Sequence, residues 1–269
     1  MSEQKEQTHF GFQSITLDEK PERVRGLFSS VAQKYDVMND VMSAGLHRLW
    51  KRHFVRICAA KAGGSYIDMA GGTGDIAFAL ARACQQEAAS RASISAETEN
   101  HISVCDLTPA MLSEGQRRFE KRQDIQNDAH KVNFDWVVCD AAQLDAIQNN
   151  RFDRYTISFG LRNVARQQEA LNEAYRVLKP GGHFACLEFS QLALPLFERA
   201  YDFYSFKVLP KMGQIIANDA DSYRYLAESI RMHPPQEELA AMLRKAGFKR
   251  VSYQNLSGGI VAIHQGFKA

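Results

Sequence analysis

The chain has 269 residues, enough for one large domain or a domain with a cap, and its 33 basic and 31 acidic side chains give a net charge of +2. This near-neutral balance argues against a surface built to hold nucleic acid, and five cysteines without a C-x-x-C pair argue against a disulfide framework or a zinc site. The polar N-terminus lacks the form of a signal peptide, and no apolar run approaches the roughly 18–20 residues of a membrane-spanning helix, which predicts a soluble, cytoplasmic protein.

The first 62 residues are expected to form a polar arm followed by a helical cap. Residues 1–20 are mostly polar and are interpreted as a loose arm. Pro21 then opens a helical pattern of apolar residues, and a second helix is predicted over 46–60. The remainder, 63–269, is expected to form the main domain.

This main domain alternates strand-like and helix-like segments. Five strands are predicted at 65–69, 101–106, 132–138, 152–158 and 183–189. The intervening helices are predicted at 75–84, 109–122 and 166–177. Such alternation predicts a parallel sheet that is covered by helices on both faces.

Three further segments depart from this alternation. Residues 85–100 are small and polar, and we expect a surface loop or an extension of the preceding helix. The pattern is helical again from 195 to 245, with a substrate-side insertion expected at about 195–235. Residues 249–267 are interpreted as two strands around a glycine turn, a terminal hairpin that would bring the sheet to seven strands.

A glycine-rich turn at 66–75, Tyr-Ile-Asp-Met-Ala-Gly-Gly-Thr-Gly-Asp, joins the first predicted strand to a helix. Gly71, Gly72 and Gly74 allow positive φ and a close ligand approach, and the free N–H groups of the helix face the turn. The G-x-G-x-x-A spacing that ends at Ala77 matches the dinucleotide fingerprint but is weak by itself. The turn favours a nucleoside-bearing cofactor, the alternative being a turn that only packs.

Three features favour S-adenosylmethionine over a nicotinamide dinucleotide. Asp68 and Asp75 flank the turn, where they would repel a pyrophosphate but tolerate a cationic amino-acid group. Asp106 ends the second strand, where a carboxylate can accept hydrogen bonds from the ribose hydroxyls of either cofactor. The phrase Val-Leu-Lys-Pro-Gly-Gly at 177–182, leading into the fifth strand, resembles class I methyltransferases.

Two more strand ends are expected to face the same site, because ligands of open α/β sheets bind outside the carboxyl ends of the strands. Asp140 and Ala141 follow the third strand, where the carboxylate can accept from the adenine amine and the alanine can offer its N–H. A plain surface turn is the alternative there. Ser158 ends the fourth strand.

Five stretches of the chain carry a more specific signal. They are KYDVMND at 34–40, GLHRLWK at 45–51, DMAGGTGD at 68–75, ISFGLRNV at 157–164 and NDADSYRYL at 218–226. Together they resemble the UbiE family of ubiquinone and menaquinone biosynthesis C-methyltransferases, over about 8–268. The departures are the insertion at 85–100 and Asp140, where relatives often have asparagine.

This resemblance implies a class I S-adenosylmethionine-dependent methyltransferase fold: a Rossmann-like, seven-stranded α/β sheet with N- and C-terminal helical additions. It implies C-methylation of the quinol ring of 2-polyprenyl-6-methoxy-1,4-benzoquinol, of demethylmenaquinol, or of both. It also implies cofactor contacts at Thr73, Asp106, Asp140, Ala141 and Ser158. Asp68, Gly71, Gly72 and Gly74 join these as cofactor-binding candidates.

Ring methylation requires the carbon to be aligned with the S–methyl bond and a neighbouring hydroxyl to lose its proton. Arg162 and Asn163 follow the fourth strand, so we expect Arg162 to be an electrostatic stabiliser that can orient a water as base, and Asn163 to bind the quinol oxygen. Tyr35, with Asp36 beside it, lies in the helical cap, where it can cover the substrate.

The general base has several other candidates. Asp219 and Asp221 lie in the C-terminal helical region, although Asp219 can simply cap a helix. His47 and His233 have the right intrinsic pKa, although helix packing or a phosphate contact explains His47 at least as well. No His or Cys pair has metal-ligand spacing, so we expect no metal.

The segment 195–217 is rich in aromatic side chains, which suits either an ordinary packed helix or a wall for a polyprenyl tail or membrane surface. A polyprenylated quinol is the expected substrate. A quinone-biosynthesis assembly, a homodimer and peripheral contact with the inner membrane are partner hypotheses. A nicotinamide-linked oxidoreductase, a nucleic-acid methyltransferase and a non-enzymatic scaffold subunit are the rival functions.

Overall fold

The computed structural model describes residues 6–32, 39–40, 43, 45–91, 95, 98–192, 207, 211, 214 and 220–269. Its strands are β1 (Gln7–Phe10), β2 (Gln13–Thr16), β3 (Ser65–Met69), β4 (Asn100–Asp106), β5 (Val132–Val138), β6 (Phe152–Ser158), β7 (Leu178–Phe189), β8 (Lys249–Leu256) and β9 (Val261–Phe267). Its main helices are α1 (Glu19–Val31), α3 (Leu46–Cys58), α4 (Asp75–Ser90), α5 (Pro109–Phe119), α6 (Gln123–Gln126), α7 (Gln167–Val177), α10 (Ala220–Arg231) and α11 (Gln236–Lys245). Two short 3₁₀ turns are η2 (Leu161–Asn163) and η5 (Ser257–Gly259).

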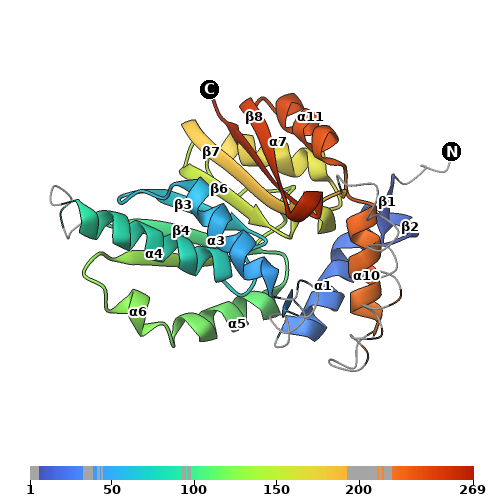
Figure 1. Cartoon of the computed structure of the whole chain (residues 1–269), viewed down its shortest axis with the longest axis horizontal. Helices are drawn as coiled ribbons and strands as arrows, with labels where there is room; N and C mark the ends of the chain where they lie inside the picture. Colours follow the sequence, from blue (N-terminus) through green and yellow to red (C-terminus); the bar gives the residue numbers. More distant parts are fainter. Residues whose placement is uncertain are drawn as a thin grey trace.

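Seven strands form one sheet in the order β5-β4-β3-β6-β7-β9-β8 (Figure 1). The five strands from β5 to β7 are parallel, whereas β9 runs antiparallel to both β7 and β8. The predicted parallel sheet with a terminal hairpin is therefore confirmed. The antiparallel hairpin arises because β8 and β9 are joined by only a short turn, which cannot make a parallel crossover.

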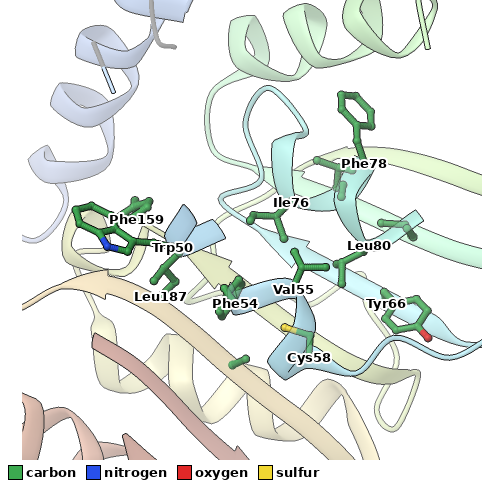
Figure 2. Close-up of a cluster of buried hydrophobic side chains, with 14 of the residues drawn as sticks. Trp50, Phe54, Val55, Cys58, Tyr66, Ile76, Phe78, Leu80, Phe159 and Leu187 are labelled. Atoms are coloured by element: carbon green, nitrogen blue, oxygen red, sulfur yellow. The ribbon is translucent and has the colours of Figure 1, made fainter. Parts of the chain in front are cut away.

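Helices cover both faces of this sheet. On one face, α3 and α4 pack a cluster that includes Trp50, Phe54 and Leu80, with Phe159 beside the Trp50 ring at 6.4 Å (Figure 2). On the other face, α7 and α11 bury their apolar sides against the sheet, for example at Leu171. The central strands are buried on both sides, as the near-continuous apolar runs predict.

One sequence interpretation is corrected at the N-terminal side of the molecule. Residues 7–16, expected to be part of a loose arm, form the β1–β2 hairpin, which packs on α10. The Phe10 ring stacks on Tyr225 at 4.2 Å, and the Phe12 N–H donates to Glu228 at 3.1 Å. Those partners lie more than 200 positions away, so the local polarity of the segment gave no sign of them.

Element boundaries also differ from the predicted ones. The helix expected to end at 84 runs to Ser90, because Gln85 and Ala88 continue the buried face of α4. This confirms the helix-extension alternative for 85–90. Strand β7 begins at Leu178 instead of 183, since Leu178 already pairs with Phe152 of β6.

Candidate active site

The carboxyl ends of β5, β4, β3 and β6 meet at one edge of the sheet, where they border a cavity of about 950 Å³, open solvent at its mouth included. The predicted residues that line it are Asp68, Gly71, Gly72, Thr73, Asp106, Asp140, Ala141, Ser158 and Asn163. Pro21, Val24 and Phe28 of α1 add an apolar wall. Side chains from four strand ends are thus brought to one place, as the sheet rule predicts.

The glycine turn after β3 can be built only from small residues. A Cβ at Gly71 would lie 2.7 Å from Val104 and 2.9 Å from the Asp68 carbonyl, and Gly72 has a φ of +51°. Gly74 is the left-handed N-cap of α4 and lies outside the cavity wall, so it shapes the turn, and its cofactor contact stays a prediction.

Asp106 is held rigidly at the end of β4. Its Oδ2 accepts from the Gly72 N–H at 3.0 Å and its Oδ1 from the Thr108 N–H at 2.8 Å. Burial raises the pKa of Asp106 to about 6, against the effect of these two N–H donors. The carboxylate therefore faces the cavity with its orientation fixed and with lone pairs left for a ligand.

Asp68 lies deeper in the same wall, almost fully buried. Its Oδ1 accepts from the Thr156 hydroxyl at 2.9 Å, whereas its Oδ2 has no hydrogen-bond partner among the described residues. Burial raises the pKa of Asp68 to about 7. Ser158 has a similarly unpartnered Oγ within the described part of the chain. Unsatisfied buried polar atoms that line a cavity fit a bound polar ligand that would pair with them.

Asp75 begins α4 and does not stand alone as a negative charge. Lys51 of α3 reaches it at 2.8 Å, and Arg118 of α5 lies at 3.5 Å. Burial acts to raise the pKa of Asp75, but the charge and hydrogen bond of Lys51, together with the charges of Arg118 and His47, outweigh it, and the pKa is lowered. The predicted repulsion of a pyrophosphate by Asp75 is thus weakened by a neighbour that the sequence did not suggest. The only sequence feature that singled out Lys51 was its position at the end of the family-like stretch 45–51.

Asp140 and Ala141 form a tight turn after β5, in which Asp140 Oδ1 accepts from the Ala142 N–H at 2.8 Å. Both residues line the cavity, and Ala141 is buried. The Asp140 carboxylate thus stabilises its own turn, and the turn also forms part of the cavity wall.

Arg162 and Asn163 are neighbours in η2, yet the structure separates their side chains. Asn163 lines the cavity, and its Oδ1 accepts from the Tyr225 hydroxyl at 2.9 Å. Arg162 is absent from that wall: it is buried in an ion pair with Glu188 at 3.0 Å, also bonds the Phe159 carbonyl, and lies over the Phe189 ring. The expected place of Arg162 beside the methyl donor is therefore not the observed one, because a buried carboxylate on β7 holds the guanidinium.

Sequence reasoning missed both of these partners. Tyr225 occurs in the stretch 218–226 and Glu188 at the end of the fifth predicted strand, but neither position has a local pattern that reveals its contact.

The other catalytic candidates are distributed as follows. Tyr35, Asp36 and Asp219 lie outside the described residues, as does most of 195–217. Asp221 is exposed and pairs with Arg224 at 3.6 Å. His47 is buried against Ser43. His233 is buried, outside the cavity wall. Within the described ranges, no group of three His, Cys, Asp or Glu side chains is arranged to hold a metal ion.

The sheet order, the glycine turn and the acidic residues at the strand ends define an α/β enzyme of the class I methyltransferase type. Solved structures share this fold. A methyltransferase from Thermotoga maritima described as S-adenosylmethionine-dependent matches 91% of this chain and 99% of its own with a TM-score of 0.57 and 16% identity. A phosphoethanolamine N-methyltransferase of Haemonchus contortus, solved with S-adenosylhomocysteine, matches 94% of this chain and 60% of its own with a TM-score of 0.58 and 13% identity.

Sequence relatives are more specific. The model of the ubiE/COQ5 methyltransferase family matches residues 16–268, so the chain belongs to this family and is a methyltransferase. A Cereibacter sphaeroides protein named ubiquinone/menaquinone biosynthesis C-methyltransferase is 53% identical over 97% of this chain and 96% of its own. An Arabidopsis thaliana protein named mitochondrial 2-methoxy-6-polyprenyl-1,4-benzoquinol methylase is 47% identical over 97% of this chain and 90% of its own. The family predicted from the motifs is thereby confirmed.

Proposed function

We propose that this protein methylates a ring carbon of a polyprenylated quinol with S-adenosylmethionine as the methyl donor. The substrate is a 2-polyprenyl-6-methoxy-1,4-benzoquinol, a demethylmenaquinol, or both. The observation that carries the proposal is the cavity at the strand ends, in which a fixed carboxylate and an unsatisfied one lie on either side of the glycine turn. The printed names of the relatives support the substrate class.

The cavity wall suits S-adenosylmethionine, which when bound would supply an electrophilic methyl group on a sulfonium. Asp106 would accept hydrogen bonds from the ribose hydroxyls. The free Oδ2 of Asp68 would accept from the cationic amino group of the cofactor. The acidic wall tolerates this cation, whereas it would disfavour a pyrophosphate. Asp140 and Ala141 would meet the adenine edge.

Three residues are proposed for the chemistry. Asn163 would donate from its amide to the quinol oxygen and stabilise the negative charge that develops when the hydroxyl gives its proton to a water molecule acting as base. Arg162 would add positive potential from its buried position without contacting the substrate in this arrangement. Tyr35 is proposed to cover the substrate from the cap. The apolar side chains of α1 would exclude water and receive the hydrophobic ring.

The membrane and partner hypotheses remain proposals of the same kind. Among the described helices, none combines the length and the apolar character that crossing a bilayer requires. A polyprenyl tail would nevertheless draw the enzyme to a membrane surface, so we propose peripheral contact. A homodimer and a quinone-biosynthesis assembly are further hypotheses.

The test is methyl transfer from labelled S-adenosylmethionine to two short-chain quinols, a methoxy-benzoquinol and a demethylmenaquinol, under reducing conditions. We expect label on the ring carbon, with the ratio of products assigning the pathway. The variant Asn163→Leu should lose most of this activity while its affinity for S-adenosylhomocysteine is nearly unchanged. Tight cofactor binding without label on either quinol would contradict the substrate and favour a scaffold role.

A further inference from the structure

A second cavity, of about 700 Å³ with open solvent at its mouth included, lies beside Arg162 of η2 and the residues that follow it. The β1–β2 hairpin, α1, α10, the start of α7 and Met242 of α11 surround it, and Figure 1 shows the first three of these elements side by side. Its described wall contains three basic side chains, His9, Lys20 and Arg162, and no aspartate or glutamate. Val164 and Ala165 separate it from the candidate active site, because they line both cavities.

Lys20 is the most unusual residue of this wall. It is only 6% exposed, and its Nζ donates to two backbone carbonyls, those of Arg162 and Val164, at 3.3 Å each. Within the described residues no carboxylate pairs with it. Burial lowers the pKa of Lys20 to about 8, so the ammonium is still largely charged at neutral pH. Carbonyl oxygens satisfy hydrogen bonds but leave the positive charge uncompensated.

The neighbouring ion pair does not neutralise this charge. Glu188 faces Arg162 at 3.0 Å and also accepts from the backbone N–H groups of Arg162 and Phe189, so its oxygens are already used. The Nε of Arg162 is buried and has no partner among the described residues. The pKa of His233 is lowered to about 3 by burial first and then by the Arg162 charge, with Lys20 contributing. Among the described residues, two buried cations thus lie near a single carboxylate, and it pairs with Arg162 and not with Lys20.

The ligand that fits such a wall is a compact oxyanion. A phosphate group can accept several N–H hydrogen bonds at once, and lysine and arginine are the side chains that bind it best. A neutral ligand would leave the excess charge in place.

The rim of the cavity indicates where the phosphate comes from. Phe12, which follows the cavity residue Gly11, is 55% exposed, and Met232 in the wall is 40% exposed. Glu228 also lies near the rim, where it accepts from the Phe12 N–H. Exposed apolar side chains beside a cationic cavity suit the interface of an anionic bilayer. We propose that the Lys20 cavity binds the phosphate group of an anionic membrane lipid, with Phe12 and Met232 inserted beside it.

The test compares binding of the full chain to vesicles of phosphatidylcholine alone and of phosphatidylcholine mixed with phosphatidylglycerol, by flotation. We expect the second mixture to bind more protein. Lys20→Met and Thr8→Glu, which places a carboxylate in the wall, should each reduce that binding by about fivefold, the contribution of one charge near an anionic surface. The control Lys131→Met removes the same charge from an exposed position directly before β5, and vesicle binding should stay unchanged. Phe12→Ser should weaken vesicle binding without changing the shift in melting temperature that inorganic phosphate causes.

A second measurement, the melting temperature in inorganic phosphate, separates the sources of the anion. One outcome is that phosphate raises the melting temperature of the wild-type protein but not of Lys20→Met, while the vesicles show no preference for phosphatidylglycerol. This outcome would support an oxyanion site in the cavity and overturn the proposal that a lipid supplies the anion. A preference for phosphatidylglycerol that survives both Lys20→Met and Thr8→Glu would overturn the cavity as the binding site. Because Thr8 lies on the hairpin and Lys20 on α1, poor folding of one variant leaves the other informative.

Discussion

The Tyr225 hydroxyl donates a hydrogen bond to Asn163 Oδ1 across 2.9 Å, and so fixes which end of the asparagine amide remains available. With Oδ1 occupied, the Nδ2 group is left as the donor that Asn163 can offer at the cavity. The Tyr225 ring is held in turn by stacking on Phe10 at 4.2 Å. An element from the far end of the chain therefore orients a residue that we place at the quinol oxygen.

Removal of this hydroxyl should slow methyl transfer without affecting the cofactor. Tyr225→Phe keeps the ring and its stacking but loses one hydrogen bond, so we expect kcat to fall by about 2–12-fold. The Kd for S-adenosylhomocysteine should stay unchanged. Tyr253→Phe, at an exposed position on β8, is the matched control in the same assay. An equal loss in both variants would show that Tyr225 does not position Asn163.

Asp106 should be the main anchor of the cofactor. Asp106→Asn keeps an oxygen acceptor but removes the charge from the ribose hydrogen bonds, and we expect the Kd for S-adenosylhomocysteine to rise by about 10–100-fold, measured by titration calorimetry. Asp140→Asn makes the same chemical change at a side chain that already accepts from the Ala142 N–H. This variant should raise the Kd for S-adenosylhomocysteine by less. Equal Kd values for the Asp106 variant and the wild type would refute the ribose contact.

Asp68 should make the ligand-free protein less stable as the pH rises. Because burial raises the pKa of Asp68 to about 7, the folded protein binds a proton that the unfolded chain has released between about pH 4 and 7, and stability falls through this window. The free energy of unfolding of Asp68→Asn should therefore increase relative to that of the wild type as the pH rises from 4 to 7, by at most about 4 kcal/mol. Urea unfolding at several pH values measures the difference.

The comparison with the wild type is needed because several buried histidines titrate in the same window. Burial lowers the pKa of His183 to about 4 and that of His233 to about 3, so their contribution to stability rises with pH, opposite to that of Asp68. These groups are common to both proteins and cancel in the difference. A difference that stays constant with pH would contradict the raised pKa of Asp68.

The buried pair of Arg162 and Glu188 should be a stability feature as well as a source of positive potential. Arg162→Met leaves the Glu188 carboxylate buried and unpaired, which should lower the free energy of unfolding by about 3–5 kcal/mol. The double variant Arg162→Met with Glu188→Gln should recover part of this loss in urea unfolding. If it recovers no stability, the pair does not act as a unit. Loss of activity in an Arg162 variant is therefore interpretable only beside its stability.

The contact between α5 and the glycine turn gives a steric prediction. A Cβ at Gly115 would lie 2.5 Å from the Trp136 ring and 2.9 Å from the Gly72 carbonyl, so Gly115→Ala should cost about 1–3 kcal/mol and weaken cofactor binding. Gly26→Ala in α1 meets nothing within 4 Å and should instead stabilise the protein by about 0.5–1 kcal/mol. Thermal unfolding and cofactor titration of both variants check the pair.

The sequence by itself determined the sheet and the position of its ligand edge. Near-continuous apolar strands, helices between them and acids at the strand ends are local signals. Gly71 leaves no room for a Cβ, and Gly72 has a positive φ of +51° that favours glycine. The strands 65–69, 132–138 and 152–158 were accordingly predicted to the residue, and the family followed from the motifs.

Only the tertiary structure decided what the individual side chains meet. Arg162 and Asn163 are adjacent, yet one turns to Glu188 and the other to the cavity, where Tyr225 bonds it from 62 positions away. Lys20 reaches carbonyls more than 140 positions away, and the hairpin at 7–16 forms on a helix near the other end of the chain. Such contacts depend on partners that folding brings together from distant parts of the sequence, whereas local patterns of polarity and glycine record only the conformation of the backbone beside them.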